Sequence, residues 1–110
     1  MADTIRVNIG LSRAKDLIES EIVEGSFTGE KIDEYTLKKD ESACVVMVFE
    51  KHFYRAGNRL TLTVILDDFN GTTRVHMIGG GGGEGLFRFD WGAAESFEDT
   101  VLTALEPYII

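Results

Sequence analysis

The sequence predicts an α+β fold in which two helices pack on one face of an antiparallel sheet of about six strands. Three runs rich in β-branched and aromatic residues follow one another at positions 43–55, 59–68 and 72–79. The turns between them contain Gly57-Asn58 and Asn70-Gly71, and Asn-Gly is the strongest short signal for a β-hairpin. Stretches with apolar residues at helical spacing precede and follow this three-stranded meander.

Residues 4–9 begin the fold as a strand, because apolar and polar residues alternate there. A helix follows, with Ser12 as its predicted N-cap and Gly25 as its predicted C′ residue. Its apolar stripe consists of Ala14, Leu17, Ile18 and Ile22. Residues 26–37 are largely polar and predict a solvated edge strand, and residues 38–41 predict the turn into the meander.

A glycine run at positions 79–85 follows the meander, and it predicts a hairpin loop or a close approach to another backbone. An alternating strand comes next. The residues on one face of that strand are Phe87, Phe89 and Trp91. The last helix is predicted to start at Ser96 and to end before Pro107. The order is therefore strand, helix, five strands, helix, in a single α+β domain over residues 1–110.

Several short segments spread over most of the chain form a further pattern. They are Asp16-Leu17-Ile18-Glu19-Ser20, Ile22, Gly25-Ser26, Val48-Phe49-Glu50, Gly57-Asn58-Arg59 and the glycine run. Together they resemble a family of short, single-domain bacterial proteins of unknown function. The layout also resembles a reduced helix-grip or TATA-binding-protein-like fold. Because these motifs are structural, the resemblance implies a fold but no activity, cofactor or partner.

The chain is acidic, with 19 Asp and Glu against 11 Lys and Arg and a formal charge of −8. Nucleic acids and anionic membrane surfaces both require Lys and Arg patches, so neither is an expected partner. No apolar run approaches the roughly 18 residues of a transmembrane helix, and the first residues do not resemble a secretion signal. A single cysteine cannot form an internal disulfide, which fits a reducing compartment. The sequence therefore predicts a cytoplasmic protein.

Two-residue turns would set the register of the meander and assign each side chain to a face of the sheet. The first turn places Glu50 opposite Ile65, and the second places Ile65 opposite His76 and Asp67 opposite Arg74. The buried face is predicted to hold Met47, Phe49, Phe53, Leu60, Leu62, Val64, Leu66, Val75 and Met77. The helices are expected to pack on that face.

The opposite face has no predicted helix to cover it, yet it holds many apolar side chains. The candidates for an interface there are Val46, Val48, His52, Tyr54, Ile65, His76 and Ile78. Contiguous exposed apolar surface usually marks a partner or ligand site. The alternative is that β-branched residues populate these strands without any partner.

No pattern predicts a catalytic residue, a cofactor or a metal site. The glycine run leads into a strand and lacks the Gly-Lys-Ser/Thr sequence and the helix N-terminus of a phosphate loop. Glu50 and His76 share a predicted row, with His52 nearby, but no third ligand is evident and structural zinc requires four. Cys44 has no adjacent base, so it is interpreted as a packing residue.

The leading hypothesis is a non-enzymatic module whose exposed sheet face self-associates into a dimer or docks another protein. The apolar ending Tyr108-Ile109-Ile110 favours it. An alternative is a small-molecule binder with a cavity between helices and sheet, lined by Met47, Met77 and aromatic residues. The residues that a metal-dependent enzyme, the third class, would use are Glu50, His52 and His76.

Overall fold

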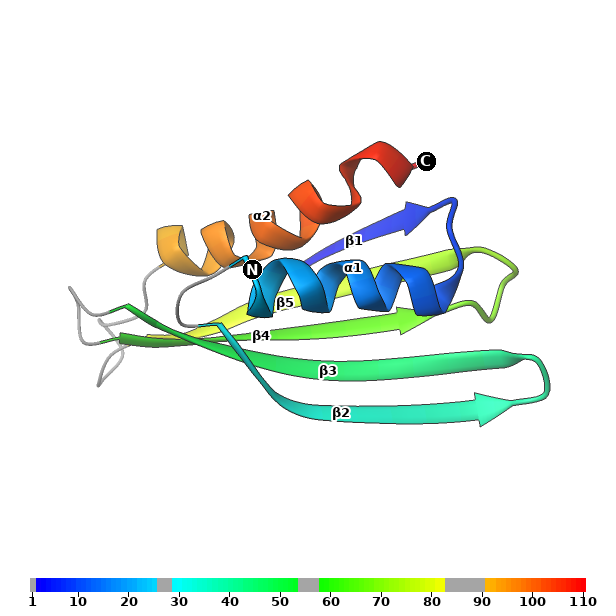
Figure 1. Cartoon of the computed structure of the whole chain (residues 1–110), viewed down its shortest axis with the longest axis horizontal. Coiled ribbons are helices and arrows are strands. Elements are labelled where there is room, and N and C mark those ends of the chain that lie inside the picture. The colour runs from blue at the N-terminus through cyan, green and yellow to red at the C-terminus, as the bar shows by residue number, and fades with distance from the viewer. Residues whose placement is uncertain (1, 26–28, 54–57, 83–90) are drawn as a thin grey trace.

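The computed structural model describes residues 2–25, 29–53, 58–82 and 91–110, with the backbone alone at 2, 52, 53, 58, 81, 82 and 91–96. These ranges form two layers, a five-stranded antiparallel sheet and two helices that lie on one face of it (Figure 1). The α+β class and the shared face of the helices are confirmed. The described ranges hold five strands rather than about six, and the strand predicted around residues 86–90 lies outside them.

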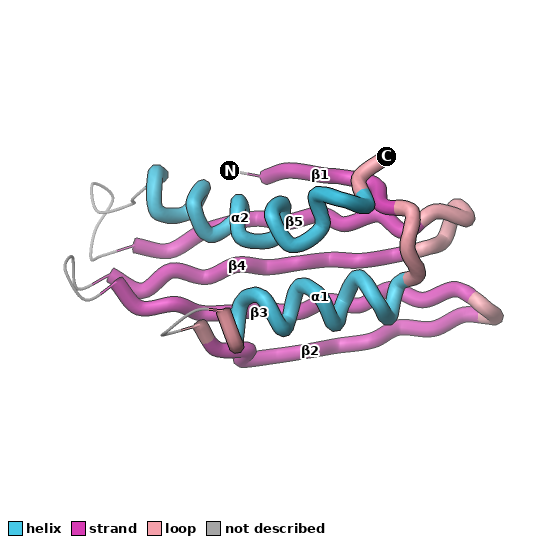
Figure 2. Tube along the Cα trace, turned by 45° about the horizontal axis from the view of Figure 1, so that its top comes forward, coloured by secondary structure: helices cyan, strands magenta, loops and turns pink. Residues whose placement is uncertain are grey.

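The elements in chain order are β1 (Ala2–Val7), α1 (Leu11–Val23), β2 (Glu30–Lys39), β3 (Ser42–Phe53), β4 (Asn58–Asp67), β5 (Thr73–Gly82), α2 (Trp91–Leu105) and the 3-10 helix η2 (Glu106–Tyr108). The strand order is β1-β5-β4-β3-β2, which makes β1 and β2 the two edges (Figure 2). α1 carries the chain from one edge to the other, so the first two strands are not neighbours. β2 is the edge strand that the polar stretch predicts.

The ends of α1 match the prediction only at the C-terminus. Gly10 is the N-cap and makes no side-chain cap, whereas Ser12 lies inside the helix and the prediction that it caps α1 is wrong. Gly25 follows the helix as predicted, and its amide donates to the carbonyl of Ser20 at 3.3 Å. A Cβ at position 25 would lie 2.5 Å from the carbonyl oxygen of Glu21, so only glycine fits this end without a shift of the backbone.

α2 begins at Trp91, before the predicted start at Ser96. The alternation that assigns Trp91 to a strand is therefore wrong at that residue. Ala93 and Ala94 follow it, and alanine has the highest helix propensity, which favours the earlier start. The helix ends before Pro107 as predicted.

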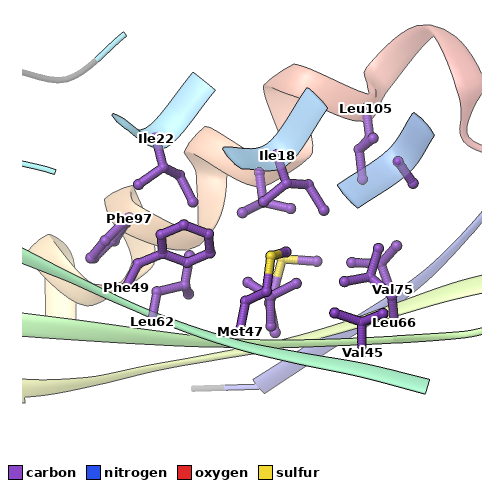
Figure 3. Close-up of a cluster of buried hydrophobic side chains, with 14 of the residues drawn as sticks. Ile18, Ile22, Val45, Met47, Phe49, Leu62, Leu66, Val75, Phe97 and Leu105 are labelled. Carbon is purple, nitrogen blue, oxygen red and sulfur yellow. The ribbon is translucent and has the colours of Figure 1, made fainter. Parts of the chain in front are cut away.

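The core lies between the sheet and the helices (Figure 3). Its side chains, none more than 4% exposed, are Val7, Ala14, Ile18, Ile22, Val45, Met47, Phe49, Leu60, Leu62, Val64, Leu66, Val75, Met77, Phe97, Val101 and Leu105. Phe49 of β3 points toward Ile22 of α1 and Phe97 of α2 in the same view. The predicted buried face is confirmed at every position whose side chain is described. The side chain of Phe53 lies outside the described part, so its burial stays a prediction.

The pairing register is as predicted in the second hairpin of the meander and wrong in the first. Ile65 pairs with His76. Glu50 pairs with Thr61 rather than with Ile65, because the pairing of Phe53 with Asn58 centres this hairpin two residues earlier in the chain than Gly57-Asn58. The pairing thus moves by four positions. An even displacement keeps each side chain on its predicted face, since side chains alternate with a period of two.

The glycine run is partly strand, because β5 continues to Gly82. The amide of Gly79 donates to Oε2 of Glu98 on α2 at 2.9 Å, and the Glu98 side chain is 4% exposed. With no side chain at position 79, the helix carboxylate reaches the strand backbone directly. The predicted hairpin loop is thus wrong for residues 79–82, and the close contact at Gly79 is with a side chain of α2 rather than with the predicted second backbone.

The last residues of the chain lie along β1. Ile109 forms a bridge with Val7, the amide of Ile110 donates to the carbonyl of Arg6 at 3.0 Å, and the amide of Asn8 donates to Tyr108 at 2.9 Å. The apolar ending that the sequence analysis offers for self-association is thus bound to the chain's own sheet.

Four charged side chains join α1 to the edge strand β2. Nζ of Lys31 pairs with Glu19 and, at 2.9 Å, with Glu34, while Nζ of Lys15 lies 3.2 Å from Glu34. Hydrogen bonds to Glu19 and Glu34 raise the pKa of Lys31. The hydrogen bond from Lys31 lowers the pKa of Glu34. This cluster fixes β2 to the helix layer at neutral pH.

Acidification is expected to weaken that attachment. A carboxylate whose pKa is lower in the folded state stabilises the protein above its unfolded pKa, and this stability is lost as the pH falls through the folded pKa. Glu34→Gln should therefore destabilise the protein at pH 7 by about 0.5–1 kcal/mol. The difference should vanish well below the usual glutamate pKa of about 4.3. Urea denaturation at pH 7 and at a pH well below that pKa measures the difference in the free energy of unfolding. Glu21→Gln, on the exposed side of α1, is the control, and a loss for Glu34→Gln that does not depend on pH would contradict this account.

Candidate functional site: the outer sheet face

The candidate site is the sheet face opposite α1 and α2, named here the outer face (Figure 1). Cross-strand pairing sorts its residues into rows that run from β2 to β1. The three central rows are Leu37, Cys44, Asp67, Arg74, Arg6; Tyr35, Val46, Ile65, His76, Thr4; and Asp33, Val48, Thr63, Ile78, Ala2. Apolar side chains extend across this array from the edge strand β2 to β5, and charged residues lie on either side of them.

The apolar strip is the set of apolar side chains that meet on these rows. It consists of Leu37, Tyr35, Val46, Val48, Ile65 and Ile78. Tyr35 is 59% exposed and Ile78 is 40% exposed, while Val46, Val48 and Ile65 are half-buried by their neighbours. Tyr35, Val46 and Ile65 are direct neighbours in one row, so the strip is continuous from the β2 edge to the central strand.

Most of the predicted interface residues lie on the outer face as expected. Those whose side chains are described there are Val46, Val48, Ile65, His76 and Ile78. The backbone of His52 pairs with Arg59, but its side chain lies outside the described part, as does all of Tyr54. A role for these residues in an interface stays a prediction.

Tyr35 and Leu37 also lie on the outer face, although neither is among the predicted interface residues. Their register depends on the turn at Asp40-Glu41, where Asp40 has a φ of 56°. Asp adopts positive φ more readily than most residues other than glycine, but no Asn-Gly or Gly-Gly pair marks the register of this turn. The alternation of Tyr35 and Leu37 with polar residues is the signal that would have shown a strand with one apolar face.

Polar side chains of the outer face are bonded to one another across strands. Nη2 and Nε of Arg74 lie 2.7 and 3.0 Å from Oδ1 of Asp67, so these two residues, predicted to lie opposite one another, form a cross-strand ion pair. Nδ1 of His76 lies 2.5 Å from Oγ1 of Thr4 on the edge strand β1. The imidazole of His76 is thus hydrogen-bonded to Thr4 within the same sheet.

The predicted row that joins Glu50, Ile65 and His76 does not form. Glu50 lies opposite Thr61, and its Oε1 is 3.2 Å from Nε of Arg59. In the described ranges no group of three or more His, Cys, Asp or Glu side chains is placed to hold a metal ion. The geometry therefore gives no support to metal-dependent chemistry at Glu50 and His76.

Cys44 lies on the outer face between Leu37 and Asp67 and is half-buried. Burial raises the pKa of its thiol, and the charge of Asp67 raises it further. The thiol is therefore protonated at neutral pH and a poor nucleophile. This environment suits the predicted packing role. The position of Cys44 on the outer face still allows its slow alkylation at alkaline pH to report on burial of that face.

An open cleft of about 720 Å³ lies between the start of α1 and the hairpin of β2 and β3, away from the outer face. Charged residues of both signs line it, among them Arg13, Lys38 and Asp40. Met47 and Met77, the predicted lining of a ligand cavity, do not contribute to this cleft and are fully buried in the core.

Neither helix in the described ranges has the length and apolar character needed to cross a membrane. The chain matches no curated protein and no solved structure. A family model described as a family of unknown function does match, over residues 1–109 of the 110. This match agrees with the resemblance to a family without assigned activity. The chain therefore belongs to this family of unknown function, DUF6054.

Proposed function

We propose that this protein is a non-enzymatic module that self-associates, with the outer face of one copy packed against the outer face of a second. The observation that carries the proposal is the apolar strip, which neither α1 nor α2 covers (Figure 2). A contiguous apolar patch rimmed by polar groups marks interaction sites on soluble domains. The polar pairs at its borders suit the rim of such an interface.

The charge of the outer face favours a second copy as the partner. Among the strand residues that the structure describes, the basic ones on this face are Arg6, Lys39, Arg59 and Arg74, and the acidic ones are Glu30, Asp33, Glu50 and Asp67. This described part of the face is thus neutral, although the chain carries a formal charge of −8. Two identical acidic chains repel one another, and the repulsion is weakest when they approach through their neutral faces.

The size of the outer face suits a stable dimer. Five strands spaced by about 4.8 Å, each rising about 3.3 Å per residue over roughly ten residues, cover about 700–800 Å². Standard protein interfaces bury about 800 Å² on each partner. Two such sheets packed about 10 Å apart would interleave their apolar strips.

Ile78→Lys is expected to halve the mass of the particle in solution, because it places a charge inside the proposed interface. Val23→Lys is the matched control, since Val23 on α1 is 39% exposed and Ile78 is 40% exposed. Light scattering coupled to size exclusion measures both masses. A wild-type protein that is monomeric at high micromolar concentration, or equal masses for the two variants, would remove the proposal.

Cys44 supplies a second measurement of the same association. Its alkylation by iodoacetamide should slow as the wild-type protein is concentrated, because the outer face becomes buried. In Ile78→Lys the rate should not depend on protein concentration. Since Cys44 is the single cysteine of the chain, the modified fraction is read directly from the intact mass.

A cytoplasmic location and a bacterial origin belong to the same proposal. A half-buried free thiol on a surface proposed for association suits a reducing compartment, where it does not form disulfides between copies.

The placement of both helices on one side of an antiparallel sheet supports the likeness to the helix-grip layout.

A further inference from the structure

The edge strand β2 is accessible on its outer side. Among the described residues it pairs with β3 and with no other strand, and most of its ten residues are exposed. A strand edge presents unpaired N–H and C=O groups that can bond to another strand. The β1 edge differs, because the chain's last residues bond to it at Arg6 and Asn8. β2 is therefore the more accessible edge of the sheet.

Charge is ordered along β2. Asp33 and Glu34 lie before its middle, and Lys38 and Lys39 lie at its end. Neither lysine forms an ion pair with any residue in the described ranges. A second β2 strand running in the opposite direction brings the acidic part of each copy to the basic part of the other. The edge is thus complementary to itself in the antiparallel direction.

We propose that β2 pairs antiparallel with β2 of a second copy, with Thr36 on the two-fold axis. The facing residues of the two copies are then Thr36 with Thr36, Tyr35 with Leu37, Glu34 with Lys38, and Asp33 with Lys39. Opposite charges, paired threonines and an aromatic residue beside an aliphatic one are all stabilising cross-strand combinations. The bulge between Lys31 and Asp33 ends the regular ladder at Asp33.

Neighbouring registers lack this complementarity. An axis at Glu34 sets that carboxylate against its own copy, and an axis at Tyr35 sets Asp33 against Leu37. An axis at Thr36 matches each charge between Asp33 and Lys39 with its opposite. It also joins Tyr35 of one copy to Leu37 of the other, so the apolar strips of the two copies become continuous.

Edge pairing extends the sheet in its own plane and leaves the outer face open, so this inference goes beyond face-to-face association. The two contacts use different surfaces and different two-fold axes. Isologous contacts of two kinds close a particle of four copies when their two-fold axes cross at right angles, and either contact alone gives a pair.

The test measures particle mass by sedimentation in the Ile78→Lys background, where face-to-face association is removed. That protein should be a dimer, and adding Lys39→Glu or Asp33→Lys should weaken the dimer by roughly tenfold or more, because each change opposes like charges at two symmetric positions. An equal mixture of the two doubly substituted proteins should form dimers again, since opposite charges face each other at both positions. Positions 33 and 39 are exposed, and circular dichroism checks that each variant is folded.

Edge pairing is overturned if Ile78→Lys alone is monomeric, if Lys39→Glu leaves its dimer intact, or if the mixture stays monomeric. The failure of face-to-face association looks different, because Ile78→Lys then keeps the wild-type mass. In that case Lys39→Glu in the wild-type background still tests the edge, and a dimer that becomes monomeric supports it.

Discussion

Phe49→Ala is expected to lower the free energy of unfolding by about 3–5 kcal/mol. The Phe49 side chain is fully buried, and it lies where β3 meets both helices, near Ile22 and Phe97 (Figure 3). Removing the ring leaves a cavity that neighbours in two separate helices would have to close together. Because a domain is stable by only about 5–15 kcal/mol, the loss is a large part of the total. Urea denaturation followed by circular dichroism measures it.

Phe69→Ala is the matched control for this substitution. Phe69 is 52% exposed in the turn after β4, so the same truncation should change stability by no more than about 0.5 kcal/mol. Similar losses for the two variants would contradict the core assigned to Phe49. A large loss for Phe49→Ala alone would support it.

Glu98→Leu is expected to destabilise the protein by about 1–3 kcal/mol. Glu98 is nearly fully buried, and its Oε2 accepts the amide hydrogen of Gly79. Leucine fills much of the same space but leaves this buried amide without that acceptor. Glu98→Gln keeps an acceptor oxygen and should recover most of the loss. Denaturation curves give the stabilities, and hydrogen exchange at the Gly79 amide reports the bond itself.

Asp99→Leu separates this effect from a change of net charge. It removes one unit of charge from the same helix, but Asp99 is exposed. Its expected effect is within about 0.5 kcal/mol. If Glu98→Gln and Glu98→Leu lose equal stability, the bond to Gly79 is not what stabilises this region.

The faces of the sheet are predictable from the sequence, whereas the pairing is predictable only in part. Val64 is buried and Ile65 lies on the outer face as predicted, because alternation is a local property of each strand. The register is also right around Asn70-Gly71, although the two-residue turn does not form, because Gly71 has positive φ and Asn70 does not. Gly57-Asn58 has the reverse order and is a weaker signal, and there the predicted register is wrong.

The remaining features depend on contacts between distant parts of the chain. The place of Tyr35 on the outer face depends on the pairing across the turn at Asp40-Glu41; the sequence predicts a turn at residues 38–41 but not the register that it sets. Burial of Glu98 depends on Gly79, which lies on a different element. Such features depend on packing between distant residues. In the apolar strip, Val46, Val48, Ile65 and Ile78 are predicted, whereas Tyr35 and Leu37 are not.

The residues bound along β1 limit how large an assembly this protein can form. A strand of another copy that extended the sheet beside Arg6 and Val7 would have to displace Ile109 and Ile110. A β-sheet can grow into a polymer only if both of its edge strands are free to pair, one with each neighbouring copy. Since residues 109 and 110 already bond to β1 there, edge pairing can extend the sheet only beside β2, so it joins two copies and cannot continue into a fibril.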